Sequence, residues 1–218
     1  MPKSLIRFLL LAGLALAGAC SAQGGAPDPY TNGVDYVTLP APHERLSPAG
    51  KVEVVEVFSY ACIHCADFAP LADQMRKELP PGAVFKLVPA VFSDEWMPFA
   101  RAYYAAEQMH LVEQTHLKLF QAKFDQHYPI NTLGELADFY AAHGANRAEF
   151  MRIATSKACD AALQRYLALT QKWGVDGTPT IVIDGTWRSA DVSTQKALAA
   201  MTLWLTKRAL AQKHDAAG

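Results

Sequence analysis

The sequence has little of what marks several classes of protein. It contains only four cysteines in 218 residues, too few for a small scaffold held by disulfides, and a chain of this length can bury its own apolar core. The formal net charge is −1, without runs of like charge, so nothing indicates a nucleic acid or an anionic membrane as a partner. There is no internal repeat or low-complexity segment. Because 51% of the residues are hydrophobic, we expect one compact domain.

Residues 1–22 have the pattern of a secretory signal. Basic residues precede an apolar run at 8–19, which is too short to span a membrane, and small residues follow it. Cleavage after Ala22 leaves a soluble chain with residues 23–35 as a flexible leader. Cleavage before Cys20 would leave this cysteine lipidated and anchored to a membrane. Either cut predicts export to an oxidising compartment, the periplasm.

The two cysteines of a Cys-x-x-Cys motif, Cys62 and Cys65, lie between a predicted strand and a predicted helix. Residues 52–60 are mostly apolar and β-branched, which is typical of a strand buried on both faces. Residues 66–79 carry their apolar side chains at helical spacing. The pattern therefore predicts Cys62 at the helix N-terminus and Cys65 one turn inside the helix.

This position predicts a reactive thiol at Cys62. Unpaired backbone N–H groups and the positive end of the helix dipole stabilise a thiolate there, and a protonated imidazole of His64 would add to this effect. Stabilising the thiolate favours the dithiol over the disulfide, so the disulfide is oxidising. We expect Cys62 to be the exposed sulfur that attacks and is attacked, and Cys65 to be the buried resolving thiol.

Three different interpretations of the motif remain open. A zinc site needs two further ligands at short spacing, and His110 and His116 lie too far along the chain from Cys65. Cys159 falls on the apolar stripe of a predicted helix, where it is expected to be buried and inert. The second interpretation is a purely structural disulfide, and the third is a copper-binding site.

The rest of the chain divides into three parts. Residues 36–93 have the pattern of a short strand followed by a β-α-β unit, and residues 94–173 have helical periodicity throughout. Within the helical part, Thr132 and Glu135 form a capping box. Residues 174–213 return to a β-hairpin followed by a long helix.

Two segments carry a resemblance to a known family. The Cys-x-x-Cys motif after the strand Glu56-Val57-Phe58-Ser59, together with Gly177-Thr178-Pro179-Thr180 before a hairpin, closely resembles the DsbA family of bacterial exported thiol–disulfide oxidoreductases. The resemblance covers nearly the whole mature chain. It implies an α/β thioredoxin fold, a mixed central sheet flanked by helices, with a helical insertion between the β-α-β and β-β-α halves.

The resemblance also implies roles for individual residues. Cys62 matches the nucleophile of the family, Cys65 the resolving thiol, and His64 the histidine that stabilises the thiolate; the acidic thiol is a known property of this family. Thr178 and Pro179 match a loop that faces the disulfide. Its proline is cis, which leaves the backbone of the preceding residue free to pair with an extended substrate.

Three more residues bear on this resemblance. Glu56 and Lys86 match a buried acid and a facing lysine beneath the active site, although ordinary exposed strand charges would give the same pattern. Ile63 stands where many members of the family have proline. Because the dipeptide between the cysteines tunes the redox potential, Ile63 bears on the strength of the oxidant.

The implied activity is donation of the Cys62–Cys65 disulfide to newly exported, unfolded proteins through a mixed disulfide. It needs no metal and no bound cofactor. A quinone-linked membrane oxidase of the DsbB type would regenerate the disulfide, and we expect a monomer, since no dimerisation domain fits before Tyr36. Two further functions remain open, a reductase of the same fold and a non-enzymatic copper-binding lipoprotein.

Overall fold

The structure is a computed structural model that describes residues 28–48 and 50–215. In these residues one mixed sheet has the strand order β1-β5-β4-β2-β3. Strands β2 and β3 are parallel, and the other neighbouring pairs are antiparallel. The strands are β1 (Tyr36–Thr38), β2 (Val52–Phe58), β3 (Ala83–Pro89), β4 (Thr180–Ile183) and β5 (Trp187–Ser189).

Strand β2 lies inside the sheet, and all seven of its residues are buried. Successive side chains point to opposite faces, so Val54 packs into one apolar cluster and Val55 into another. A strand covered on both faces must be almost continuously apolar, which explains the sequence of β2. It also makes the two buried acids of this strand unusual. Glu53 accepts hydrogen bonds from the N–H groups of Leu46 and Ser47, whereas Oε2 of Glu56 has no partner among the described residues.

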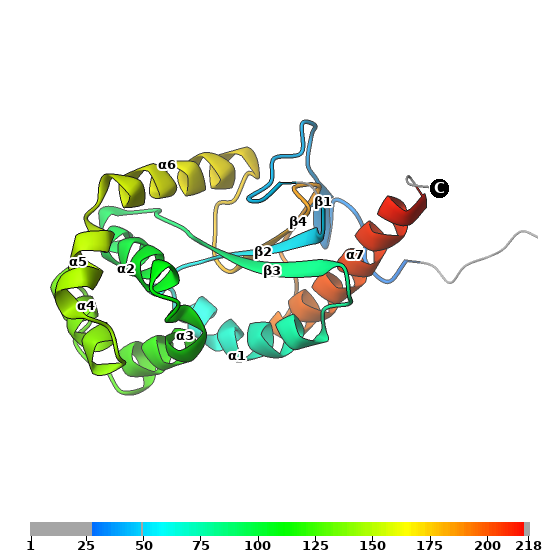
Figure 1. Ribbon diagram of the computed structural model, residues 1–218. Coiled ribbons are helices and arrows are strands. Elements are labelled where there is room, and N and C mark those ends of the chain that lie inside the picture. Colours follow the sequence, from blue (N-terminus) through cyan, green and yellow to red (C-terminus); the bar gives the residue numbers. More distant parts are fainter. Residues whose placement is uncertain (1–27, 49, 216–218) are drawn as a thin grey trace, which may run out of the picture.

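Helices cover both faces of the sheet (Figure 1). Helices α1 (Ile63–Glu78) and α7 (Gln195–Asp215) lie together on one face, and α6 (Lys157–Lys172) lies on the other. The remaining helices gather beyond the end of the sheet at which β2 ends. They are η1 (Asp94–Trp96), α2 (Met97–Gln108), α3 (Val112–Phe120), the π-helical turn η2 (Gln121–Asp125), α4 (Leu133–Ala142) and α5 (Arg147–Ala154).

The predicted fold class is confirmed. The β1, β2-α1-β3 and β4-β5-α7 elements form the sheet and its helices on one face, and η1 to α6 lie between β3 and β4 in the chain. The predicted capping box is also present: Thr132 accepts a hydrogen bond from the N–H of Glu135, and the Glu135 carboxylate accepts one from the N–H of Thr132. The start of helix α4 is thus set by local sequence.

Local contacts fix both ends of the part of the chain that the structure describes. The final helix begins at Gln195, because the hydroxyl of Thr194 accepts a hydrogen bond from the N–H of Ala197 at 3.1 Å and caps the helix there. At the other end, residues 28–35 lie against β1, where Asn32 Oδ1 accepts from the N–H of Thr38 at 3.0 Å. The predicted signal segment and Cys20 lie outside the described residues.

Candidate active site

The end of β2 and the start of α1 place the two cysteines. Cys62 is the N-cap residue of α1, with φ −99° and ψ 118°, and no side chain caps the helix. No side chain therefore competes with the sulfur for the first N–H groups of the helix, which can act on a charge there. Cys65 lies inside the first turn and is fully buried, whereas Cys62 is only partly buried. Both are free thiols in this structure.

The two thiols have very different proton affinities. The pKa of Cys62 is lowered to about 5, chiefly by a hydrogen bond from the Cys65 thiol. Burial opposes this shift, while the Thr178 side chain and the backbone N–H groups of Cys65 and His64 add to it. The pKa of Cys65 is instead raised far above its ordinary value, first by burial and then by the neighbouring sulfur of Cys62. At neutral pH, Cys62 is therefore a thiolate and Cys65 a thiol.

A loop before β4 faces these sulfurs. The Thr178–Pro179 peptide bond is cis, and Sγ of Cys62 lies 3.4 Å from the carbonyl oxygen of Thr178, to which the thiol donates when it is protonated. The hydroxyl oxygen of Thr178 is buried and has no hydrogen-bond partner among the described residues. It is thus free to donate to a thiolate at Cys62.

The two residues between the cysteines are both exposed. Ile63 has 46% of its surface accessible, which makes it one of the exposed large apolar side chains. His64 acts on Cys62 through its backbone, which lowers the pKa of the Cys62 thiol. The structure therefore brings His64 to the site, but through its peptide group.

Glu56 lies beneath the active site. Its exposed fraction is 1%, and Oε2 has no hydrogen-bond partner among the described residues. Burial raises the pKa of Glu56 to about 8, so the carboxyl group is largely protonated at neutral pH. Its charged form would raise the pKa of Cys65 further. The interpretation of Glu56 as an ordinary exposed strand charge is wrong.

Lys86 does not face Glu56 as the resemblance implied. The parallel register places Lys86 opposite Val55 and Leu87 opposite Glu56, so Lys86 and Glu56 lie on opposite faces of the sheet. No ion pair joins Lys86 and Glu56 in the described chain, and Lys86 is half-buried on the edge strand β3. The acid therefore has no cation to neutralise it, which is consistent with its raised pKa.

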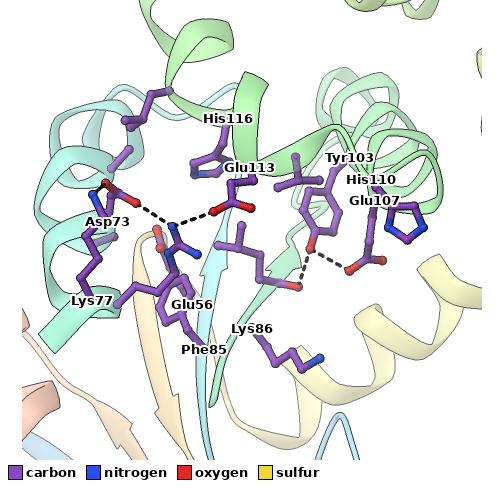
Figure 2. Close-up of a pocket in the computed structure, with 16 residues that line it drawn as sticks. Glu56, Asp73, Lys77, Phe85, Lys86, Tyr103, Glu107, His110, Glu113 and His116 are labelled. Carbon is purple, nitrogen blue, oxygen red and sulfur yellow. Dashed lines mark hydrogen bonds and ion pairs between the residues drawn. The ribbon is translucent and has the colours of Figure 1, made fainter. Parts of the chain in front are cut away.

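A pocket of about 590 Å³ lies beside the edge strand β3 and is lined by both Glu56 and Lys86 (Figure 2). Figure 2 shows the hydroxyl of Tyr103 directed toward Glu107, and their oxygens are 3.0 Å apart. On the opposite wall, Asp73 pairs with Arg76 at 3.1 Å. Most charges around this pocket are thus paired with one another or bonded to a hydroxyl group.

Sequence reasoning missed two side chains near the site. His116 on α3 is hydrogen-bonded through Nδ1 to the hydroxyl of Tyr60 at 2.9 Å, and burial lowers the pKa of His116 to about 4. Gln195 on α7 donates from Nε2 to the carbonyl oxygen of His64 at 3.0 Å. Both contacts join segments far apart in the chain, so no local pattern signals them.

The chemistry of the site follows from its sulfurs. No group of three or more His, Cys, Asp or Glu side chains in the described residues is arranged to hold a metal ion. What the geometry provides is an acidic, accessible thiol next to a buried, weakly acidic one, which is the arrangement required for thiol–disulfide exchange. On a thioredoxin fold, this dithiol defines a thiol–disulfide oxidoreductase.

Comparison with known proteins agrees with this class. The sequence profile of the thioredoxin family matches residues 47–201. The thiol:disulfide interchange protein DsbA of Burkholderia cepacia is 32% identical over 194 residues, which are 89% of this chain and 90% of that protein. DsbA of Pseudomonas aeruginosa strain PAO1 is 31% identical over 183 residues, 84% of this chain and 86% of that protein.

Solved structures show the same relationship. The crystal structure of the oxidoreductase DsbA from Xylella fastidiosa has a TM-score of 0.79 and 33% identity, and the match covers 84% of this chain and 98% of that one. DsbA from Pseudomonas aeruginosa has a TM-score of 0.78 and 29% identity, over 85% of this chain and 97% of that one. The chain belongs to the DsbA family of thiol:disulfide interchange proteins, and it is an enzyme of this kind.

Proposed function

We propose that this enzyme works as an oxidase, which donates the Cys62–Cys65 disulfide to unfolded proteins after their export. The observation that carries the proposal is the low pKa of Cys62, about 5, next to the raised pKa of Cys65. A thiolate that is stabilised this strongly makes the reduced form the favoured one, so the disulfide readily passes to other thiols. In a reductase the thiolate is stabilised less, so that the disulfide is the favoured form.

The exchange takes place in two steps. A substrate thiolate attacks Sγ of Cys62 in the disulfide, a mixed disulfide forms, and the Cys65 sulfur leaves and takes up a proton because its pKa is high. A second substrate thiolate then attacks the substrate sulfur of the mixed disulfide and releases Cys62 as a stable thiolate. The substrate loses two electrons and gains a disulfide, and the enzyme ends as the dithiol.

Several residues around the sulfurs have roles in this proposal. The backbone of Thr178 beside cis-Pro179 pairs with an extended substrate chain, and the exposed side chain of Ile63 offers an apolar contact. His64 stabilises the thiolate in this proposal, and Glu56, once ionised, would raise the pKa of Cys65 further. Lys86 lines the neighbouring pocket without contacting the acid.

The partners and the location are part of the same proposal. Residues 1–22 direct the chain to the periplasm, and Cys20 is the candidate for lipidation. The enzyme is a monomer. A quinone-linked membrane oxidase of the DsbB type reoxidises it. No helix within the described residues is both long enough and apolar enough to cross a membrane. Membrane anchoring in this proposal would use Cys20.

Transfer of the disulfide to a reduced, unfolded protein tests the function directly. The oxidised enzyme should form disulfides in such a protein, and Cys62→Ala should abolish the reaction. Cys65→Ala, which lacks the resolving thiol, should accumulate covalent adducts at Cys62 when it is mixed with a protein disulfide. Cys159→Ala is the control, since Cys159 is buried elsewhere in the fold. Stoichiometric binding of copper without any exchange would contradict the proposal.

A further inference from the structure

Helix α7 packs against the active-site helix through apolar side chains and, at its first residue, through a hydrogen bond. Gln195 is the first residue of α7, and its amide Nε2 donates to the carbonyl oxygen of His64 at 3.0 Å. The position of Gln195 is set by the cap at Thr194, which accepts hydrogen bonds from the N–H of Ala197 through its hydroxyl and of Leu198 through its carbonyl. The amide is thus held at the end of a rigid helix, 131 residues away in sequence from the group it contacts.

The carbonyl group of His64 and the N–H group of Cys65 belong to the same peptide unit. The N–H of Cys65 is one of the groups that lower the pKa of Cys62. When a donor binds the oxygen of a peptide group, the group becomes more polar and its N–H becomes a stronger donor. A chain of polar contacts therefore runs from Gln195 through this peptide group to the sulfur of Cys62.

We propose that Gln195 is a positioning residue for disulfide exchange, which orients and polarises the His64–Cys65 peptide group and so stabilises the Cys62 thiolate. Gln195 acts through this peptide group and does not touch the reacting sulfurs. The inference rests on the proposed function and extends it: the oxidising power of the enzyme depends in part on how α7 is docked against α1. A change in how α7 contacts the first turn of α1 would therefore change the redox potential.

Substitutions at Gln195 separate donation from mere packing. Gln195→Met keeps the length of the side chain without a donor. Gln195→Glu keeps the shape but presents acceptors only, and an acid at a helix N-terminus favours the helix, so α7 remains intact. Gln212→Met is the matched control, because Gln212 is exposed near the other end of the same helix.

The pKa of Cys62 and the equilibrium with glutathione are the two measurements. Such polarisation changes the energy of a hydrogen bond by about 10–30%. For a bond to a charged group, the loss of this polarisation in Gln195→Met should raise the pKa of Cys62 by about 0.3 units. The equilibrium constant with glutathione should shift about twofold toward the disulfide of the enzyme. Gln195→Glu should shift both quantities further in the same direction, and Gln212→Met should leave both unchanged.

Each outcome has one meaning. Denaturant unfolding of the oxidised forms shows whether the Gln195 variants are folded. If the wild-type pKa is low and both folded variants keep the wild-type pKa and equilibrium constant, the inference is wrong. The proposed oxidase function would still stand. An equal shift in Gln212→Met would also overturn the inference. If Gln195→Met does not fold, the uncharged variant Gln195→Leu, which also lacks a donor, takes its place. A wild-type pKa near that of free cysteine, about 8.5, would instead contradict the proposed function itself.

Discussion

The thiol of Cys62 and the carbonyl oxygen of Thr178 lie 3.4 Å apart, although 116 residues separate them in the chain. The first residue ends the strand-to-helix turn after β2, and the second precedes cis-Pro179 at the start of β4. Strands β2 and β4 are antiparallel, hydrogen-bonded neighbours, so the loop after β2 and the loop before β4 meet at the same end of the sheet. A substrate that pairs with the Thr178 backbone would therefore present its sulfur directly to Cys62.

The ionisation of Cys62 is the first quantity to measure. We expect the ultraviolet absorbance of the thiolate to titrate with a pKa of about 5 in the reduced protein. Cys159→Ala is the appropriate background, because it leaves only the active-site thiols among those the structure describes. A value near 8.5 would mean that the helix N-terminus and the neighbouring donors do not act on the sulfur.

The reduced protein should be more stable than the oxidised protein at neutral pH. A thiol whose pKa falls on folding contributes stability that is fully present above its unfolded pKa and is lost as pH falls through its folded value. The folded value here is about 5, so the advantage of the reduced form should grow by about 1.4 kcal/mol per pH unit from pH 5 to 7. Denaturant unfolding of both forms at several pH values measures it. If the oxidised form is the more stable one, the disulfide is structural or the enzyme is a reductant.

Replacement of His64 tests the role that family resemblance gives to its imidazole. In His64→Ala the backbone N–H and the helix dipole remain, so only the contribution of the ring is lost. We expect the pKa of Cys62 to rise and the redox potential to become more negative by about 30 mV for each pKa unit. Equilibration with glutathione measures the potential. An unchanged potential in a folded variant would assign the stabilisation to peptide groups and to the Thr178–Pro179 loop.

Glu56 should make the stability of the protein decrease with rising pH. Its pKa is raised to about 8 on folding, so its contribution is fully present below its unfolded pKa, about 4.5, and is lost as pH rises through 8. Glu56→Gln cannot ionise. Between the unfolded and the folded pKa of Glu56, the stability of the wild type relative to this variant should therefore fall with rising pH. The fall should total a few kcal/mol, at most about 1.4 kcal/mol per pH unit.

Unfolding of the oxidised forms avoids the titration of Cys62 and isolates the effect of Glu56. Glu78→Gln, a change at an exposed carboxyl group at the end of α1, is the matched control. It should show the wild-type dependence on pH. A constant difference between wild type and Glu56→Gln across this range would mean that the pKa of Glu56 does not change on folding.

The sequence by itself determined the local elements and the reactive pair. An apolar β-branched run predicted β2, a change to helical spacing predicted α1, and the capping box predicted where α4 begins. These signals are local, because backbone geometry and burial of one face depend on near neighbours in the chain. The motif Cys62-x-x-Cys65 at the strand–helix junction was enough to predict which sulfur is buried.

Only the tertiary structure decided which distant groups act on these sulfurs. The placement of Lys86 opposite Val55 depends on the register between β2 and β3, which no pattern in either strand specifies alone, and it leaves Glu56 without a cation. The contact between Gln195 and His64 depends on how α7 docks against α1. Hydrogen bonds and charges act through space, so the proton affinities of the site become readable only when the packing that brings these groups together is known.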